Sequence, residues 1–102
     1  MVINEEMKSV IENSAFLTIV TMCPDGNPHP IIVGSGTVEG DDITVGVYAM
    51  KVTQENLKKN DCAMVLAAQK VEGGAKGCRF TGSAKVSDGK FVFTATKAEA
   101  LI

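Results

Sequence analysis

Short apolar runs separated by glycine-containing turns are the feature that most restricts the fold of this 102-residue chain. Residues 15–22 are mostly apolar or β-branched, a Cys-Pro-Asp-Gly-Asn-Pro cluster follows them, and Asp88-Gly89 separates two later runs. Asp-Gly between such runs is a strong turn signal, because both residues tolerate the positive φ of tight turns. Strands joined by short turns pair antiparallel, since a parallel pair needs a long crossover. The pattern predicts a mainly antiparallel β-protein, a barrel or a sandwich.

We expect about six strands in this sheet. They cover residues 15–22, 29–38, 43–48, 62–68 and 79–86, and the sixth begins at Phe91. Gly34 and Gly36 interrupt the second run, which indicates a kink or a bulge. The run 62–68 is continuously apolar, which predicts a strand buried on both faces. Residues 72–77 are expected to form a flexible loop, and residues 97–102 fit a helical stub or a strand equally well.

Two short helices complete the expected fold. Asn4 can cap an N-terminal helix whose first turn holds Glu5 and Glu6, where the helix dipole favours acids. A second helix is expected over residues 53–60, with Thr53 as its cap and two lysines near its end. It is inserted between the third and fourth strands.

The charge balance excludes several classes of partner. Ten Lys and Arg residues against twelve Asp and Glu residues give a net charge of -2, which is unlike the basic footprint of a nucleic-acid binder. No apolar run approaches the roughly 20 residues that a membrane helix needs. The acidic start of the chain does not resemble a secretion signal, so we expect a cytoplasmic protein.

The size and the cysteines add two further expectations. Residues 1–102 are enough for one domain with a modest core, so association into a homodimer is a natural way to bury more apolar surface. Three cysteines and one histidine, with no Cys-x-x-Cys spacing, argue against a zinc site or a disulfide framework. We therefore expect free thiols and no metal.

The passage from residue 47 to residue 56 is the most informative candidate site. A strand ends there and a helix begins, with the hydroxyl of Thr53 and the ammonium of Lys51 close to its first turn. The first amides of a helix lack partners within the helix, and its dipole is positive there, so such a place binds phosphate. The alternative is that Thr53 only caps the helix and that Lys51 is solvated.

No motif for acid–base or nucleophilic catalysis accompanies this passage. The chain has neither a Gly-x-x-x-x-Gly-Lys-Ser/Thr loop nor a Gly-x-Gly-x-x-Gly turn between a strand and a helix. His29 lies between two prolines beside a turn, with no carboxylate or cysteine near it in sequence. If the protein performs chemistry, we expect a bound cofactor to supply it. Whether the protein is an enzyme stays open.

Four elements of the chain, taken in order, form a recognisable series. The first is a helix and a strand followed by Asp25-Gly26 and Pro28-His29. The second is the passage Met50-Lys51-Val52-Thr53-Gln54-Glu55-Asn56-Leu57, and the third is the strand Met64-Val65-Leu66. The fourth is the segment Lys76-Gly77-Cys78-Arg79-Phe80-Thr81-Gly82-Ser83-Ala84. Together they cover roughly residues 4–93, and in this order they resemble the FMN-binding split barrels related to pyridoxamine 5'-phosphate oxidase, in particular their small FMN-binding members.

The resemblance implies a split β-barrel that binds FMN in a groove at a homodimer interface. By position, Lys51 and Thr53 would meet the phosphate, with assistance from Asn56. Tyr48, Ala49 and Met50 would line the ribityl chain or the ring edge. Ile31, Ile32 and Val33 would face the isoalloxazine ring.

Two departures from the resembled pattern keep alternatives open. Val52 stands where relatives often have a second lysine, and the chain ends before the last helix and strand of many members. One reading is a redox protein that passes hydride or electrons through FMN. Another is a binding module without turnover for FMN, a deazaflavin or haem, and a third is a structural dimer that has lost its ligand.

Overall fold

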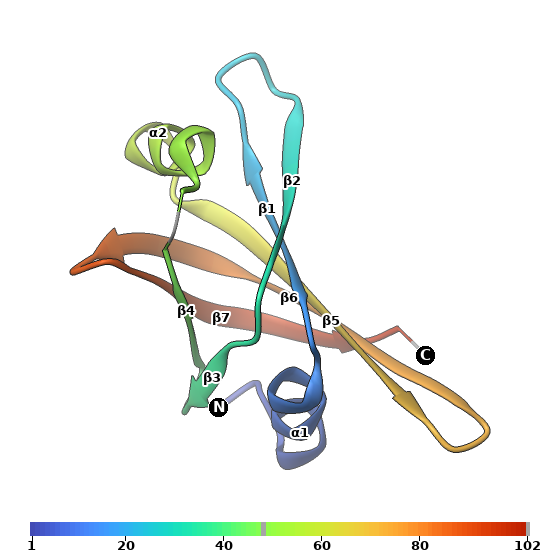
Figure 1. Ribbon diagram of the computed structural model, residues 1–102. Coiled ribbons are helices and arrows are strands. Elements are labelled where there is room, and N and C mark those ends of the chain that lie inside the picture. The colour runs from blue at the N-terminus through green and yellow to red at the C-terminus, as the bar shows by residue number, and fades with distance from the viewer. Residues whose placement is uncertain (48, 102) are drawn as a thin grey trace.

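The computed structural model describes residues 1–47 and 49–101 (Figure 1). Within these residues, two helices and seven strands follow one another. They are α1 (Glu5–Asn13), β1 (Leu17–Met22), β2 (Pro28–Val33), β3 (Thr37–Glu39), β4 (Asp42–Gly46), α2 (Lys51–Lys59), β5 (Cys62–Val71), β6 (Gly74–Ser87) and β7 (Lys90–Ala100).

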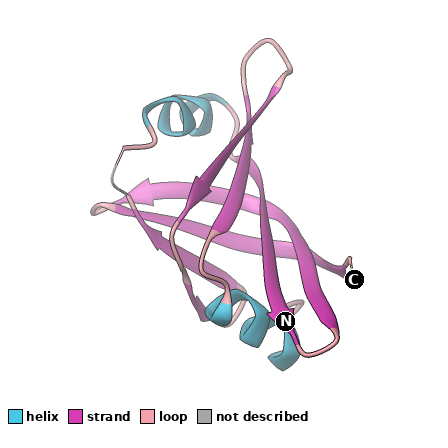
Figure 2. Ribbon diagram, turned by 45° about the vertical axis from the view of Figure 1, so that its right-hand side comes forward, coloured by secondary structure: helices cyan, strands magenta, loops and turns pink. Residues whose placement is uncertain are grey.

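All seven strands belong to one antiparallel sheet in the order β2-β1-β5-β6-β7-β4-β3. The sheet is curled, and the hairpin of β1 and β2 crosses the long ribbons of β6 and β7 (Figures 1 and 2). α1 packs near one end of the sheet against β3, β5 and β6, and α2 packs against β1 and β6. The predicted mainly antiparallel split barrel with two helices is confirmed.

The expected second strand is in fact two strands. β2 ends at Val33 and pairs with β1, whereas β3 begins at Thr37 and pairs with β4 at the opposite edge of the sheet. The chain passes between the two edges through residues 34–36. A Cβ atom added at Gly36 would come within 3.0 Å of Leu17 Cδ1, so this passage runs close to β1. The glycines mark a change of edge rather than a kink within one strand.

Two other expectations about the strands were wrong. Only Glu72 and Gly73 form a turn between β5 and β6, and Gly74 already begins β6, so residues 72–77 are not a loop. β5 is buried on one face only, because no other described part of the chain covers its second face: Ala63 and Val65 are buried, whereas Met64 is 37% exposed. Residues 97–100 of the undecided C-terminal segment belong to β7, which pairs with β6 as far as Ala100, and Ile102 lies outside the described residues.

The core lies inside the curl of the sheet. Phe80, Phe91 and Phe93 are fully buried, together with Ile19 and Val65 from the neighbouring strands. Burying one such side chain stabilises the fold by about 1.5–3 kcal/mol. Because side chains alternate along each strand, these residues occupy alternate positions that all face inward.

The N-terminal segment is fixed at two points. The Asn4 side chain accepts a hydrogen bond from the Met7 amide at 2.8 Å, which confirms the expected cap of α1. The amides of Val2 and Ile3 donate to the Asp41 carboxylate, and these bonds lower the pKa of Asp41.

Neither described helix is long and apolar enough to cross a membrane.

We expect Gly82→Ala to destabilise the fold by about 1–3 kcal/mol, which is the usual cost of overpacking. Gly82 lies at the register shift between β6 and β7, and a Cβ atom there would overlap the carbonyl group of Thr94. The free energy of unfolding from denaturant titration measures the effect.

Gly74→Ala is the matched control, because a Cβ atom at Gly74 meets nothing within 4 Å. It should leave stability unchanged or raise it by up to about 1 kcal/mol. Equal losses in the two variants would contradict the steric explanation.

Candidate functional site

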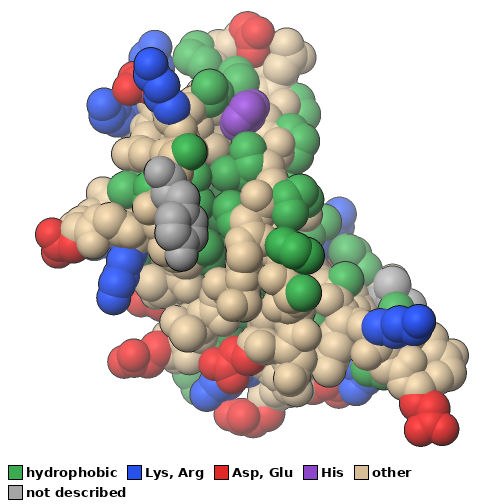
Figure 3. Space-filling view, viewed as in Figure 1, with side chains coloured by type: hydrophobic (Ala, Val, Ile, Leu, Met, Phe, Trp, Pro, Cys, Tyr) green, Lys and Arg blue, Asp and Glu red, His purple; other side chains and the backbone are tan. Residues whose placement is uncertain are grey.

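A groove of about 440 Å³ lies between β2 and the connection from β4 to α2. Hydrophobic side chains gather on this side of the molecule, along β2 and toward α2 (Figure 3). The lining residues come from four segments: Phe16, Ile31, Ile32, Val33, Gly34, Gly46, Ala49 and Met50. Five of the nine residues expected to bind a cofactor therefore line one groove.

The alternation of β2 decides how its residues meet the groove. His29, Ile31 and Val33 are half-buried and share one face of the strand. Ile32 is 67% exposed and points from the opposite face, although it still borders the groove. Ile31 and Val33 are therefore the two residues of this group that can lie against a bound ring.

The second helix begins at the end of this groove. Its first residue is Lys51, and the preceding residue, Met50, has a left-handed backbone with φ 54 and no side-chain cap. The Gln54 amide donates the first helical hydrogen bond to the Met50 carbonyl at 2.8 Å. The amides before Gln54 have no acceptor within the helix. Lys51 is exposed beside them, and Ala49 and Met50 line the groove next to this turn.

Thr53 does not cap α2 as expected. It is the third residue of the helix, it is 1% exposed, and its Oγ1 has no hydrogen-bond partner among the described residues. The helix begins two residues earlier than expected, directly after Met50, whose backbone adopts the left-handed conformation. The hydroxyl of Thr53 is therefore enclosed by protein, and the helix amides and Lys51 are the polar groups on the surface.

Asn56 is also buried, with 3% of its surface exposed. Its Nδ2 donates to Thr21 Oγ1 at 3.1 Å and lies 3.5 Å from Cys23 Sγ. These contacts join the middle of α2 to the end of β1, and they hold the amide away from the helix N-terminus. Asn56 thus positions α2, and the expected assistance to a phosphate would need a rearrangement.

One expected residue and three unexpected ones remain to be located relative to the groove. Tyr48 lies outside the described residues. Phe16, Gly34 and Gly46 line the groove but were not expected to do so. The sequence held one usable signal for them, since Gly34 interrupts an otherwise apolar run.

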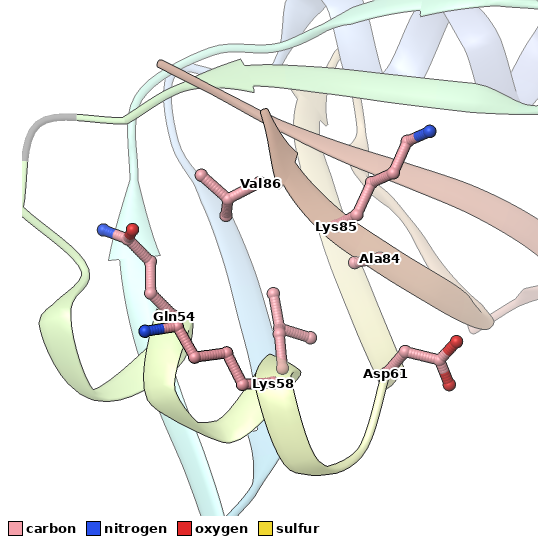
Figure 4. Close-up of a pocket in the computed structure, with 7 residues that line it drawn as sticks. Gln54, Lys58, Asp61, Ala84, Lys85 and Val86 are labelled. Atoms are coloured by element: carbon pink, nitrogen blue, oxygen red, sulfur yellow. The ribbon is translucent and has the colours of Figure 1, made fainter. Parts of the chain in front are cut away.

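A second pocket of about 330 Å³ lies between α2 and β6 and shares no residue with the groove (Figure 4). Gln54 and Lys58 reach it from α2, Asp61 from the connection to β5, and Lys85 from β6. Its charged groups have both signs and are accessible to water. No expected site residue lines it, and the apolar groove remains the better match to a planar ligand.

The described residues contain no group of three or more His, Cys, Asp or Glu side chains placed to hold a metal ion. His29 shares the inner face of β2 with Ile31, but no hydrogen bond orients its ring within the described part of the chain. The groove can bind an apolar ring and an attached anion, and its residues offer no evident acid–base pair.

Solved structures with the same architecture identify the fold. A point variant of HupZ from Group A Streptococcus aligns with a TM-score of 0.82 and 18% identity, covering 97% of this chain and 99% of that one. The chain has the split-barrel fold. A candidate pyridoxamine 5'-phosphate oxidase from Lactobacillus delbrueckii aligns with this split barrel at a TM-score of 0.78 and 22% identity, covering 95% and 93% of the two chains.

An FMN-binding protein from Syntrophomonas wolfei aligns with a TM-score of 0.77 and 13% identity, covering 93% of the split barrel and 83% of that protein. Further matching structures are described as an FAD-binding protein from Mesorhizobium loti, a haem-binding protein from Mycobacterium smegmatis and an F420 reductase. No family model matches the sequence, and no curated protein matches it either. The resemblance to the oxidase-related split barrels is thus confirmed at the level of the fold.

We expect Asn56→Ala to destabilise the protein by about 1–3 kcal/mol, because the substitution leaves the buried Thr21 hydroxyl without a partner. Thr21→Val should also destabilise it, and the double variant should lose less stability than the sum of the two. The free energies of unfolding of all three variants give the coupling between the two side chains. Strictly additive losses would show that the two side chains act independently.

Proposed function

We propose that this split barrel binds FMN in the groove between β2 and α2. One observation carries the proposal: the apolar groove ends at the uncapped N-terminus of α2, where Lys51 is exposed. In the proposed arrangement the isoalloxazine ring lies against Ile31 and Val33, and the phosphate lies beside the first amides of α2. Neighbours with the same fold that are described as binding FMN or FAD support this ligand class.

The size and lining of the groove fit such a ligand. Its volume of about 440 Å³ falls in the range of small-molecule sites, roughly 300–1,000 Å³. A Cβ atom added at Gly34 meets nothing within 4 Å, so the space above this glycine is open to a bound ring. Ala49 and Met50 connect that space to the helix N-terminus.

The phosphate would be held mainly by backbone groups and one cation. A helix N-terminus attracts anions through its free amides and its dipole. Lys51 adds a charge, whereas the neighbouring Val52 is 47% exposed and adds none. Because a charge-assisted hydrogen bond is roughly twice as strong as a neutral one, we expect weaker binding than in a relative with two lysines.

We further propose a redox role in the cytoplasm, the transfer of hydride or electrons. The flavin supplies that chemistry when it is bound. The residues of the chain bind the cofactor, orient its ring and limit the access of water. This role requires no acid–base pair from the protein, which agrees with the side chains that line the groove.

Haem is a second candidate ligand, for a binding module without turnover. His29 shares the inner face of β2 with Ile31 and Val33, and imidazole is a common axial ligand of haem iron. A neighbour with the same fold is described as haem-binding. A deazaflavin would use the same apolar groove as FMN, and one neighbour is described as an F420 reductase.

We also propose that the chain forms a homodimer through the outer face of its sheet. This outer face consists of the outward residues of β1, β2 and β5: Val20, Met22, Pro28, Pro30, Ile32, Cys62 and Met64. None of them is buried in the single chain. A contiguous apolar surface of this kind usually marks an interaction site. A symmetric pair of copies would cover it and would border the groove next to Ile32.

Titration with FMN and with riboflavin tests the proposed ligand and its orientation. Flavin fluorescence reports binding, and the unaltered chain should bind FMN more tightly than riboflavin. Lys51→Gln should weaken FMN binding roughly tenfold or more and leave riboflavin binding unchanged, because a hydrogen bond to a charged group contributes about 1.5–3 kcal/mol. Gly34→Leu should weaken the binding of both ligands by filling the groove.

Two controls match these variants. Lys59→Gln removes a cation from the other end of α2, and Gly74→Leu adds a side chain in open space outside the groove. Neither should change FMN affinity. A colourless protein that does not bind added FMN would rule out the flavin assignment, and a parallel titration with haem separates the two candidate ligands.

Ile32→Lys should convert the homodimer to a monomer, since it places a charge on the outer face at the edge strand β2, where the second copy would border the groove. Sedimentation velocity at micromolar concentration measures the change. Lys70→Glu serves as a control, because it alters the charge of an exposed residue far along β5. An unaltered chain that sediments only as a monomer would contradict the dimer.

A further inference from the structure

We propose that Met22, Cys62 and Met64 form a binding site for a monovalent soft metal ion, Cu(I), on the outer face of the sheet. The three residues line a single pocket of about 200 Å³, whose other lining residues are Val20, Pro28, Ala63 and Thr81. The site is separate from the proposed flavin groove and does not rest on the flavin assignment. Its three ligands belong to the outer face, so the site is open in the single chain and lies at the interface of the proposed homodimer.

The register of the sheet brings the three sulfur-containing side chains together. Cys62 and Met64 are two residues apart on β5, so they project from the same face. Val20 of β1 pairs with Met64 and Thr21 pairs with Ala63, where the ladder ends. Met22 and Cys62 are the next residue on each strand, and both line the same pocket. Directly opposed residues of an antiparallel pair have Cβ atoms about 4.5–5.5 Å apart, a separation that one ion can bridge through longer side chains.

The start of β5 is held firmly at this point. The Cys62 amide donates a hydrogen bond to Asn60 Oδ1 at 3.0 Å, and the Asp61 carbonyl accepts one from the Ala84 amide at 2.9 Å. These bonds fix the backbone where α2 gives way to the strand. The Cys62 side chain therefore projects from a defined position beside the two methionines.

The chemistry of the donor set selects the ion. Thiolate and thioether sulfur atoms are soft ligands that favour Cu(I), whereas zinc sites usually have four ligands and draw on imidazole and several thiolates. One thiolate and two neutral thioethers balance the single charge of Cu(I). Binding replaces the proton of the Cys62 thiol with the metal, and that proton passes to solvent. The apolar walls strengthen the attraction between the ion and the thiolate.

The other two cysteines are poorly placed to compete for the ion. Cys78 is 4% exposed, and burial raises the pKa of its thiol, which disfavours the thiolate form. Cys23 is half-buried, and its Sγ lies 3.5 Å from the side-chain Nδ2 of Asn56. Cys62 is exposed and has two thioether neighbours. The combination of one accessible thiol with two methionines distinguishes this place from a lone cysteine.

Anaerobic titration with Cu(I), in competition with the chromogenic chelator bathocuproine disulfonate, tests the site. The unaltered chain should bind one Cu(I) per chain. Cys62→Ser should abolish binding that competes with the chelator. Met22→Leu and Met64→Leu should each weaken binding roughly tenfold or more. Removing even a residue that only supports a metal ligand costs about tenfold in affinity, and removing a ligand should cost at least as much.

Leucine nearly conserves the volume of methionine, so these variants should keep the fold, which circular dichroism and thermal unfolding without metal will verify. Met7→Leu in α1 and Cys23→Ser are the matched controls and should bind like the unaltered chain. The Ile32→Lys variant should bind at least as tightly as the unaltered chain, because all three ligands come from one chain and no second copy covers them. Binding that survives Cys62→Ser, that is unaffected by both methionine variants, or that is lost in Ile32→Lys would overturn the proposal.

Discussion

The structure depends on one topological constraint: two strands that follow each other in the chain lie at opposite edges of one sheet. β2 and β3 are separated by only three residues, so a flat sheet of seven strands could not place them on its two outer edges. The sheet must curl until its edges approach each other. The line along which they meet is left open by the short connection at residues 34–36, and the apolar groove lies there, between β2 and the end of β4.

The contact that positions the second helix relative to this opening is made by the middle of the helix and not by its ends. The buried hydrogen bond from Asn56 to Thr21 joins α2 to β1. The first turn of the helix is thereby left at the surface, with Lys51 exposed and with the residues before it in the groove. The same arrangement separates the two proposed sites. The inner face of β2 borders the groove, whereas Met22, Cys62 and Met64 lie on the outer face of β1 and β5.

Features governed by neighbouring residues could be predicted from the sequence, and features governed by distant ones could not. Asp88 and Gly89 both have the positive φ that their turn requires, and Asn4 caps α1 as its chemistry suggests. The start of α2 was misplaced because Thr53 is the better cap by residue type, whereas the chain uses Met50 in a left-handed conformation. The bond between Asn56 and Thr21 joins residues 35 positions apart and leaves no local trace. An apolar run such as 62–68 cannot reveal which of its faces the rest of the chain covers.

The first turn of α2 has a consequence for the thermodynamics of the whole chain. Met50 has a backbone conformation that is unfavourable for any residue with a Cβ atom, and the buried hydroxyl of Thr53 has no acceptor among the described residues. Both features reduce the stability of the folded state at the place where the helix amides are free. By mass action, a ligand bound there at a hundred times its dissociation constant would add about 2.7 kcal/mol to the unfolding free energy, so occupancy of the groove would be visible as a rise in melting temperature.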